Sequence, residues 1–328
     1  MRTRSLSVLI ILTLLAAACR GLDDTDVADP SEGASVTQTP TAEAPAYPRT
    51  ITHLGGTDTL EEQPTNVITL GFSPTDVAVG LGVIPVGAFT NSKQEPFGTH
   101  APLAEYADQI ESIGVFEINL EVIAALQPDL IVGLSWIEGF KGYDEMKKVA
   151  PVMVLDPVAH WTSWLEDVAY ALGLEDKADE IIATYEARAA EVDALIPDGT
   201  EVALVSPTDG GIEVNGPYSA AGQIALDAGL EVLTITDGAI DWQGETGGDV
   251  VWTELSKERI EEVTSPTMIV LTIRPGQFDE VKSDPLWTRL PAFQNDAVYL
   301  VEEGEAWFQP GPLGAMFALD QIASFYGF

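Results

Sequence analysis

Short, continuous apolar runs separated by amphipathic stretches constrain the fold of this chain more than any other feature. In the first half, apolar runs occupy residues 67–70, 85–88, 130–133 and 152–155. Between these runs, residues 73–81 and 120–126 show the pattern of a helix. Apolar runs that lack polar alternation are typical of strands buried on both faces of a parallel sheet. The pattern therefore predicts an α/β half whose parallel sheet is covered by helices on both faces.

A long helical zone separates this half from a second one with the same alternation. We expect helices over residues 161–172 and 177–195, with Asp176 as an N-cap and Pro197-Asp198-Gly199 as the stop. In the second half we expect strands at residues 202–205, 232–235, 268–271 and 297–300, and helices at 220–228, around Ile260 and at 312–325. The second helix of the zone is a candidate for a rigid strut between two α/β halves.

The N-terminus has the order of a lipoprotein export signal. Two arginines, an apolar run over residues 6–15 and three alanines precede Cys19, the only cysteine. The run is too short to span a membrane, which takes about 20 apolar residues. Residues 16–19 resemble a lipobox, so we expect residues 1–18 to be a signal peptide and Cys19 to carry the lipid anchor. An ordinary secretory signal with an incidental cysteine is the alternative.

Residues 20–48 hold almost no large apolar residue and are rich in Asp, Thr, Ser, Ala and Pro. Such a composition predicts a disordered stalk. The expected organisation is a signal peptide (1–18), an acylated cysteine with a stalk (19–48), an N-terminal α/β lobe (49–158), an inter-lobe helical zone (159–197) and a C-terminal α/β lobe (198–328).

The formal net charge of −37 excludes one class of partner. Nucleic-acid binding requires a basic surface, and adhesion to an anionic membrane through protein charge does as well. The lipid is therefore the expected tether, and no nucleic-acid partner is expected.

Two segments repeat one plan. Residues 119–132, NLEVIAALQPDLIV, join a capped helix, a Pro-Asp turn and a buried strand. Residues 256–263, followed by the apolar run at 268–271, repeat that order in the second half. The halves thus look like pseudo-duplicates.

Together with the motifs at residues 64–68, 81–87, 143–154 and 284–293, these segments carry a family resemblance. Over roughly residues 64–326 the chain resembles the periplasmic binding proteins of ABC importers, in the class that carries ferric siderophores, haem and vitamin B12. The resemblance implies an α/β fold of two Rossmann-like lobes, each with a mainly parallel sheet, joined by a long rigid helix. It also implies a ligand held between the lobes and little hinge motion.

The implied function is that of a monomeric, membrane-anchored, extracytoplasmic substrate-binding component. It would capture a ferric siderophore and deliver it to a permease dimer with a cytoplasmic ATPase; cobalamin or haem is the alternative cargo. The resemblance assigns permease docking to Glu121 and Glu258, which occupy matching positions in the two repeats. Carboxylates there would accept hydrogen bonds from permease arginines. The alternative is that both simply favour a helix dipole.

Ligands of open α/β sheets bind beyond the carboxyl ends of the strands. The expected ligand-binding residues on such loops are Phe72, Ser73, Asn91, Trp136, Arg274 and Trp307. Aromatic rings offer contact area and an arginine would hold an oxygen-rich anion, so Arg274→Ala is expected to weaken binding of an anionic complex. Core positions for the two tryptophans and an exposed ion pair for Arg274 are the alternatives. Because few cationic side chains are available for a multiply anionic chelate, a neutral or weakly anionic hydroxamate, or a cobalamin, is favoured as the ligand.

His53, His100 and His160 are too widely spaced to predict a metal site and are expected at the surface or as caps. Any iron should therefore arrive already chelated, and no cofactor is expected. The chain has neither a G-x-S-x-G elbow nor a phosphate-binding glycine loop, which argues against an enzyme. A structural surface lipoprotein is the non-transport alternative.

Overall fold

The computed structural model describes residues 46–92, 94–115, 118–134, 143–240 and 250–327. The predicted signal peptide, Cys19, almost all of the stalk and Trp136 lie outside these residues. Residues 44–328 form one compact unit. Among the described residues, no helix has both the length and the apolar character needed to cross a membrane.

The first half is built on a five-stranded sheet, with strand order β5-β4-β3-β6-β7 and every pairing parallel. Its strands are β3 (Val67–Leu70), β4 (Gly87–Thr90), β5 (Glu111–Val115), β6 (Leu130–Leu134) and β7 (Val152–Leu155). Val67 and Val132 face one buried cluster, whereas Ile68 and Ile131 face another. Both faces of the sheet are therefore covered, which explains the unbroken apolar runs.

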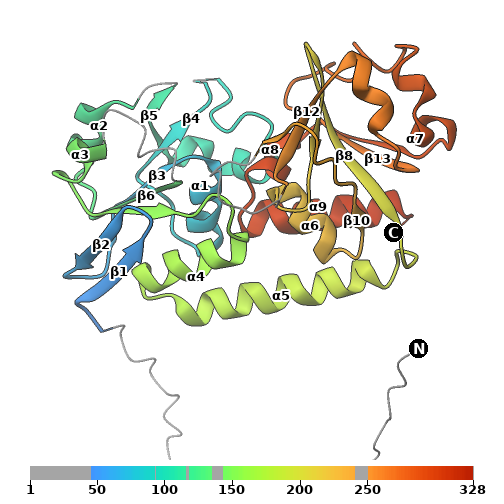
Figure 1. Cartoon of the computed structure of the whole chain (residues 1–328). Helices are drawn as coiled ribbons and strands as arrows, with labels where there is room; N and C mark the ends of the chain where they lie inside the picture. The colour runs from blue at the N-terminus through green and yellow to red at the C-terminus, as the bar shows by residue number, and fades with distance from the viewer. Residues whose placement is uncertain (1–45, 93, 116–117, 135–142, 241–249, 328) are drawn as a thin grey trace, which may run out of the picture. The chain divides into compact units, whose positions relative to one another are not determined.

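Helices and a hairpin surround this sheet (Figure 1). They are α1 (Phe72–Gly80), the 3-10 helix η1 (Ala101–Gln109), α2 (Leu120–Ala125), α3 (Tyr143–Met146), and the antiparallel pair β1 (Arg49–His53) and β2 (Gly56–Leu60). The hairpin and η1 were not expected from the sequence.

The second half has a seven-stranded mixed sheet, with strand order β11-β12-β9-β8-β13-β14 and β10 beside β8. Its strands are β8 (Glu201–Thr208), β9 (Gly211–Asn215), β10 (Glu231–Val232), β11 (Ala239–Ile240), β12 (Trp252–Ser256), β13 (Thr267–Leu271) and β14 (Val298–Val301). Strands β8, β10, β13 and β14 are parallel, but β9, β12 and β11 pair antiparallel. The α/β class is confirmed, while this sheet is mixed rather than mainly parallel.

Further helices of the second half include α6 (Ala220–Asp227), α7 (Pro291–Gln294), α8 (Gly304–Phe308) and the 3-10 helices η3 (Lys257–Glu262) and η4 (Trp287–Arg289). The expected helix around Ile260 is the 3-10 helix η3. The expected strand over residues 232–235 continues only to Val232.

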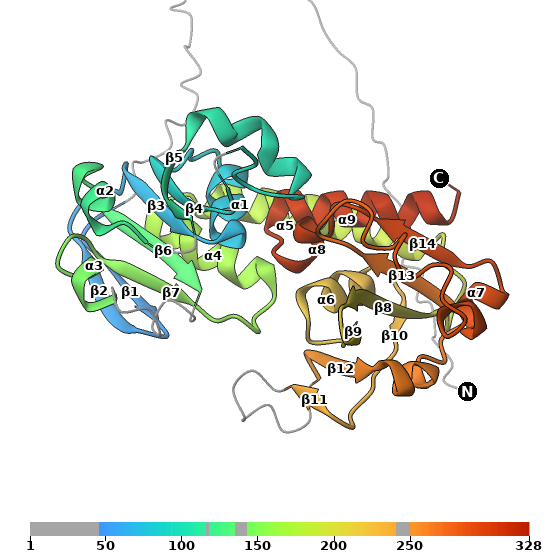
Figure 2. The ribbon, with the colours of Figure 1, turned by 90° about the horizontal axis from the view of Figure 1, so that it is seen from above.

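Long helices run beneath and between the two sheets: α4 (Trp161–Leu172), α5 (Glu175–Asp193) and α9 (Pro312–Phe325). Figure 2 shows α9 lying over α5, against which it packs, and α9 also packs against α1 and α4. Asp176 is not the N-cap of α5. Gly173 ends α4 in a left-handed conformation (φ 68°), so α5 begins directly after Leu174 and Asp176 lies in its first turn.

A buried carboxylate joins the chain's last helix to its first. Asp76 of α1 is fully buried, and its two oxygens accept the backbone N–H groups of Leu313 and Gly314, each at 2.8 Å. These are orphan donors of the first turn of α9, where the helix dipole favours negative charge. His100 Nε2 lies 3.3 Å from Asp76 Oδ2. Asp76 is thus an N-cap supplied from a distant element.

Candidate functional site

A pocket of ≈ 360 Å³ lies where segments of both halves meet. The first half and its exit to α4 contribute Ser73, Leu134, Pro157, Val158 and Trp164; the second half and α8 contribute Glu213, Asn215, Tyr218, Ser219, Ala220, Ala221, Val251, Trp252, Phe308 and Gln309. A second hollow of ≈ 260 Å³ shares Glu213 and Phe308 with the first. The volume and the mixture of aromatic and polar walls suit a small molecule.

The wall on the second half is shaped by the alternation of β9. Ile212 and Val214 face a buried apolar cluster, whereas Glu213 and Asn215 face the pocket. Across the sheet, Glu213 pairs with Ser206 of β8. Side chains of paired residues emerge on the same face. Two adjacent strands, β8 and β9, therefore present Ser206, Glu213 and Asn215 on one face, and these three side chains form the polar floor of the pocket.

Two buried hydrogen-bonding groups on this floor have no partner. The Nδ2 of Asn215 and the Oγ of Ser206 are buried and have no hydrogen-bond partner. Burial raises the pKa of Glu213, and the carboxylate of Glu254, opposite it on β12, raises it further. The nearby amide of Asn215 opposes this rise without making a hydrogen bond of good geometry. Among the described residues, no Lys, Arg or His lines either hollow.

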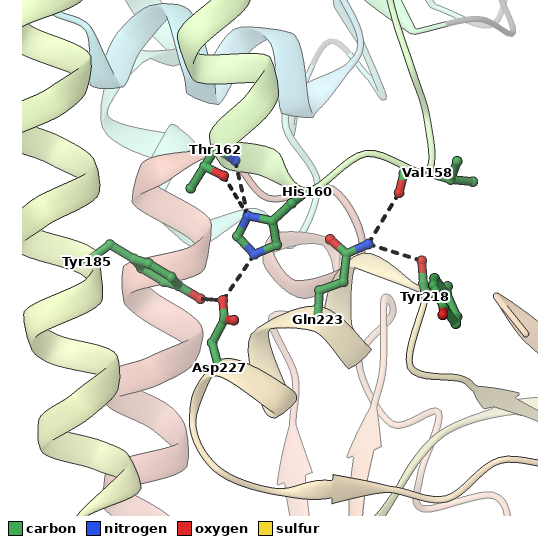
Figure 3. Close-up of polar contacts among 7 residues, drawn as sticks. All are labelled: Val158, His160, Thr162, Tyr185, Tyr218, Gln223 and Asp227. Carbon is green, nitrogen blue, oxygen red and sulfur yellow. Dashed lines mark hydrogen bonds and ion pairs between the residues drawn. The ribbon is translucent and has the colours of Figure 1, made fainter. Parts of the chain in front are cut away.

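The connecting segments are fixed by hydrogen bonds across the two halves (Figure 3). Gln223 Nε2 of α6 donates to the carbonyl oxygens of Val158 and Tyr218, at 3.3 and 3.4 Å. His160 accepts the Thr162 N–H at the start of α4, and its Nε2 lies 3.0 Å from Asp227 of α6. These contacts position Val158 and Tyr218, which both line the pocket.

A larger hollow of ≈ 560 Å³ lies beside α5 and includes His160, Tyr185 and Asp193. Apart from His160, which lies in the loop after β7, its lining comes from the helices α4, α5 and α6 rather than from strand-end loops, so we assign the ligand to the smaller pocket. Within the described ranges, no group of three or more His, Cys, Asp or Glu is placed to hold a metal ion.

The three histidines divide into two kinds. His160 is a cap, and His53 accepts the Gly55 N–H in the first hairpin, with Nε2 3.0 Å from Asp58. The expectation of a surface or capping role is wrong for His100, which is fully buried and makes no side-chain cap. Its place beside Asp76 in the core explains the burial.

The structure describes five of the six expected ligand residues and places one of them on the pocket wall. Ser73 lines it, but its neighbour Phe72 packs into the core against Phe97, with ring centroids 5.7 Å apart. Trp307 is also a core residue: it is fully buried and its indole N–H donates to Gln321 Oε1 at 2.7 Å. The next residue, Phe308, lines both hollows.

The other expected residues lie elsewhere. Asn91 is exposed in a turn, where its backbone N–H donates to the Pro96 carbonyl, and Trp136 lies outside the described residues. Arg274 forms a two-point ion pair with Glu280, at 2.7 and 3.1 Å, and lines neither hollow. The ion-pair alternative is thus the one that the structure matches.

We accordingly expect Arg274→Ala to change ligand affinity by less than about twofold, because the exposed ion pair lies outside both hollows. Fluorescence titration of both proteins with one ferric chelate measures this. A loss of tenfold or more would place the guanidinium on the ligand.

Glu121 and Glu258 occupy equivalent local positions. Asn119 caps α2 and accepts the Glu121 N–H at 3.1 Å, and Ser256 is the N-cap of η3, two residues before Glu258. Both glutamates are exposed, and neither forms an ion pair with another described residue. Hydrogen bonds from its own backbone N–H and from Ser256 lower the pKa of Glu258. An exposed carboxylate without an ion-pair partner among the described residues therefore lies at the start of each helix.

Residues 67–303 match the sequence profile of the periplasmic binding proteins. The chain belongs to this family. It is similar to the probable siderophore-binding lipoprotein YfiY of Bacillus subtilis, with 25% identity covering 85% of this chain and 87% of that protein. The Fe(3+)-citrate-binding protein YfmC of Bacillus subtilis is 26% identical, covering 91% and 90%.

A solved structure supports the architecture of this binding protein. Staphylococcus aureus SirA, complexed with staphyloferrin B, superposes with a TM-score of 0.71 at 26% identity and covers 84% of this chain and 98% of its own. The family resemblance predicted from the motifs is thereby confirmed, and the family is one of binding proteins rather than enzymes.

Proposed function

We propose that this binding protein captures a ferric siderophore in the pocket between its two halves and delivers it to an ABC permease with its ATPase. The observation that carries the proposal is the pocket itself, which strand-end segments of both sheets enclose in a chain of this family. Relatives named for iron chelates support the ligand class.

The lining favours a hydroxamate over a polyanionic chelate. Catecholate and citrate complexes carry several negative charges and call for cationic partners. The described lining supplies aromatic rings and one half-buried carboxylate, that of Glu213. Cobalamin and haem, the other cargoes of this transporter class, remain to be tested in the same assay.

A fluorescence titration tests the function. The signal-free chain is mixed with ferric hydroxamates, ferric catecholates, ferric citrate, haem and cobalamin, and quenching of Trp164 and Trp252 on the pocket wall is followed. We expect saturable binding of a ferric hydroxamate at micromolar concentration or below. Iron-free hydroxamate is the matched control and should bind more weakly. If no compound of the panel quenches the fluorescence, the proposal is contradicted and a structural surface lipoprotein is favoured.

We further propose that Cys19 carries a lipid that holds the protein on the extracytoplasmic face of the cell membrane. The basic, apolar and small-residue order before Cys19 supports this, as do relatives that are lipoproteins. Mass spectrometry of membrane-extracted protein should find a diacylglycerol adduct on Cys19. A free thiol on the mature protein would refute the anchor.

A further inference from the structure

The polar floor of the pocket combines features that a purely structural surface would not keep. Asn215 is only 4% exposed and Ser206 only 9%, yet Asn215 Nδ2 and Ser206 Oγ have no hydrogen-bond partner. Buried polar groups in folded proteins are normally satisfied, because an unpaired one costs stability. Both side chains face a hollow large enough for a ligand. Their partners are therefore expected from a ligand.

Glu213 lies at the junction of the two hollows and is the acidic residue of the polar floor. It lines both hollows, pairs across β8 with Ser206 and across β12 with Glu254, and has no cationic partner among the described residues. An ammonium or another donor in the hollow stabilises the ionised form of Glu213, which accepts its hydrogen bonds, and so opposes the rise in pKa that burial and Glu254 cause. A ligand group against it must therefore bring a donor or a positive charge.

We propose that Glu213, with Asn215 and Ser206, selects ferric chelates that carry an ammonium or other hydrogen-bond donor and discriminates against polyanionic chelates. The inference rests on the proposed function and adds the charge class of the ligand. The Glu213 carboxylate accepts a hydrogen bond from the donor group of the chelate. The Nδ2 of Asn215 donates a hydrogen bond to an oxygen of the chelate. The preference arises because an anion would meet a carboxylate in a partly dry pocket without a compensating cation.

A pair of ligands that differ in one charge isolates this effect. Ferrioxamine B carries a pendant ammonium, and its N-acetylated form keeps the same iron-binding core without that charge. We expect the wild-type chain to bind ferrioxamine B about tenfold more tightly than the acetylated form, as one charge-assisted hydrogen bond allows. Ferric citrate should bind more weakly than either.

Variants then locate the preference. Glu213→Gln keeps the side-chain shape and should bring the affinity ratio of the two ligands close to one, with affinity for the acetylated form retained. The matched control is Glu231→Gln, an exposed glutamate at the start of β10, which should keep the wild-type ratio. Thermal unfolding of each variant verifies that it is folded. The affinity ratio of the two ligands on the wild-type chain tests the inference without depending on the folding of any variant.

The outcomes separate the two proposals. Wild-type binding of both ligands with equal affinity, a preference for the acetylated form, or an unchanged ratio in Glu213→Gln would overturn the inference and leave the siderophore function standing. Failure of wild-type protein to bind any ferric chelate would overturn both.

Discussion

The double charge reversal Glu121→Lys with Glu258→Lys should abolish uptake of the iron chelate while leaving its affinity for the binding protein within about twofold. Both glutamates are exposed at the second residue after a cap, one on each half. A carboxylate that meets a permease arginine loses a strong, directional pair on reversal and gains a repulsion, so uptake should fall more than about tenfold. Uptake of radioactive iron by cells that express the whole importer measures this.

The matched control reverses Glu62 and Glu231, which are exposed, one on each half, just before β3 and at the start of β10. It makes the same change in net charge and should retain uptake. Normal uptake by the Glu121/Glu258 variant, with only a loss of thermal stability, would assign both residues to the helix dipole instead.

The replacement Asp76→Asn should lower the free energy of unfolding by about 3 kcal/mol, since it breaks a buried, charge-assisted contact. Asp76 accepts two N–H groups at the start of α9 and lies against His100. An amide supplies one acceptor and turns its own N–H₂ toward the other donor. Urea unfolding, followed by circular dichroism, measures the loss.

Asp179→Asn on the exposed side of α5 is the control, with an expected change of at most about 0.5 kcal/mol. A similarly small change in the Asp76 variant would show that the carboxylate does not join α1 to α9. Because α9 also packs against α5, we expect the loss to be global rather than confined to one half.

The sequence predicted most closely the fully buried strand β3 and two helices with a clear buried face. The strand β3 and the helices α4 and α9 have the bounds that hydrophobic spacing indicates. The antiparallel strand β9 was missed although its signals are present. Asp209 and Gly210 form a typical hairpin turn, and residues 211–215 alternate apolar and polar. Because a parallel sheet was assumed, neither the turn nor the alternation was interpreted as part of an antiparallel hairpin.

The candidate site was predicted by loop but not by residue. The strand-end rule led to segments that line the candidate pocket at Ser73 and Phe308, yet it cannot tell which of two adjacent side chains turns inward. Trp307 and Phe72 turn toward the core. The ion pair of Arg274 could not be foreseen, because its partner Glu280 lies six residues along an irregular loop, where no helical or strand period predicts the contact.

The most direct test of the account is a crystal structure of the signal-free chain grown with ferrioxamine B, with data collected at the iron absorption edge. We expect one strong anomalous peak in the pocket between the halves, bordered by Ser73, Asn215 and Trp252. A peak in the hollow beside α5, next to Tyr185 and Asp193, would contradict it, as would iron bound only at the outer surface.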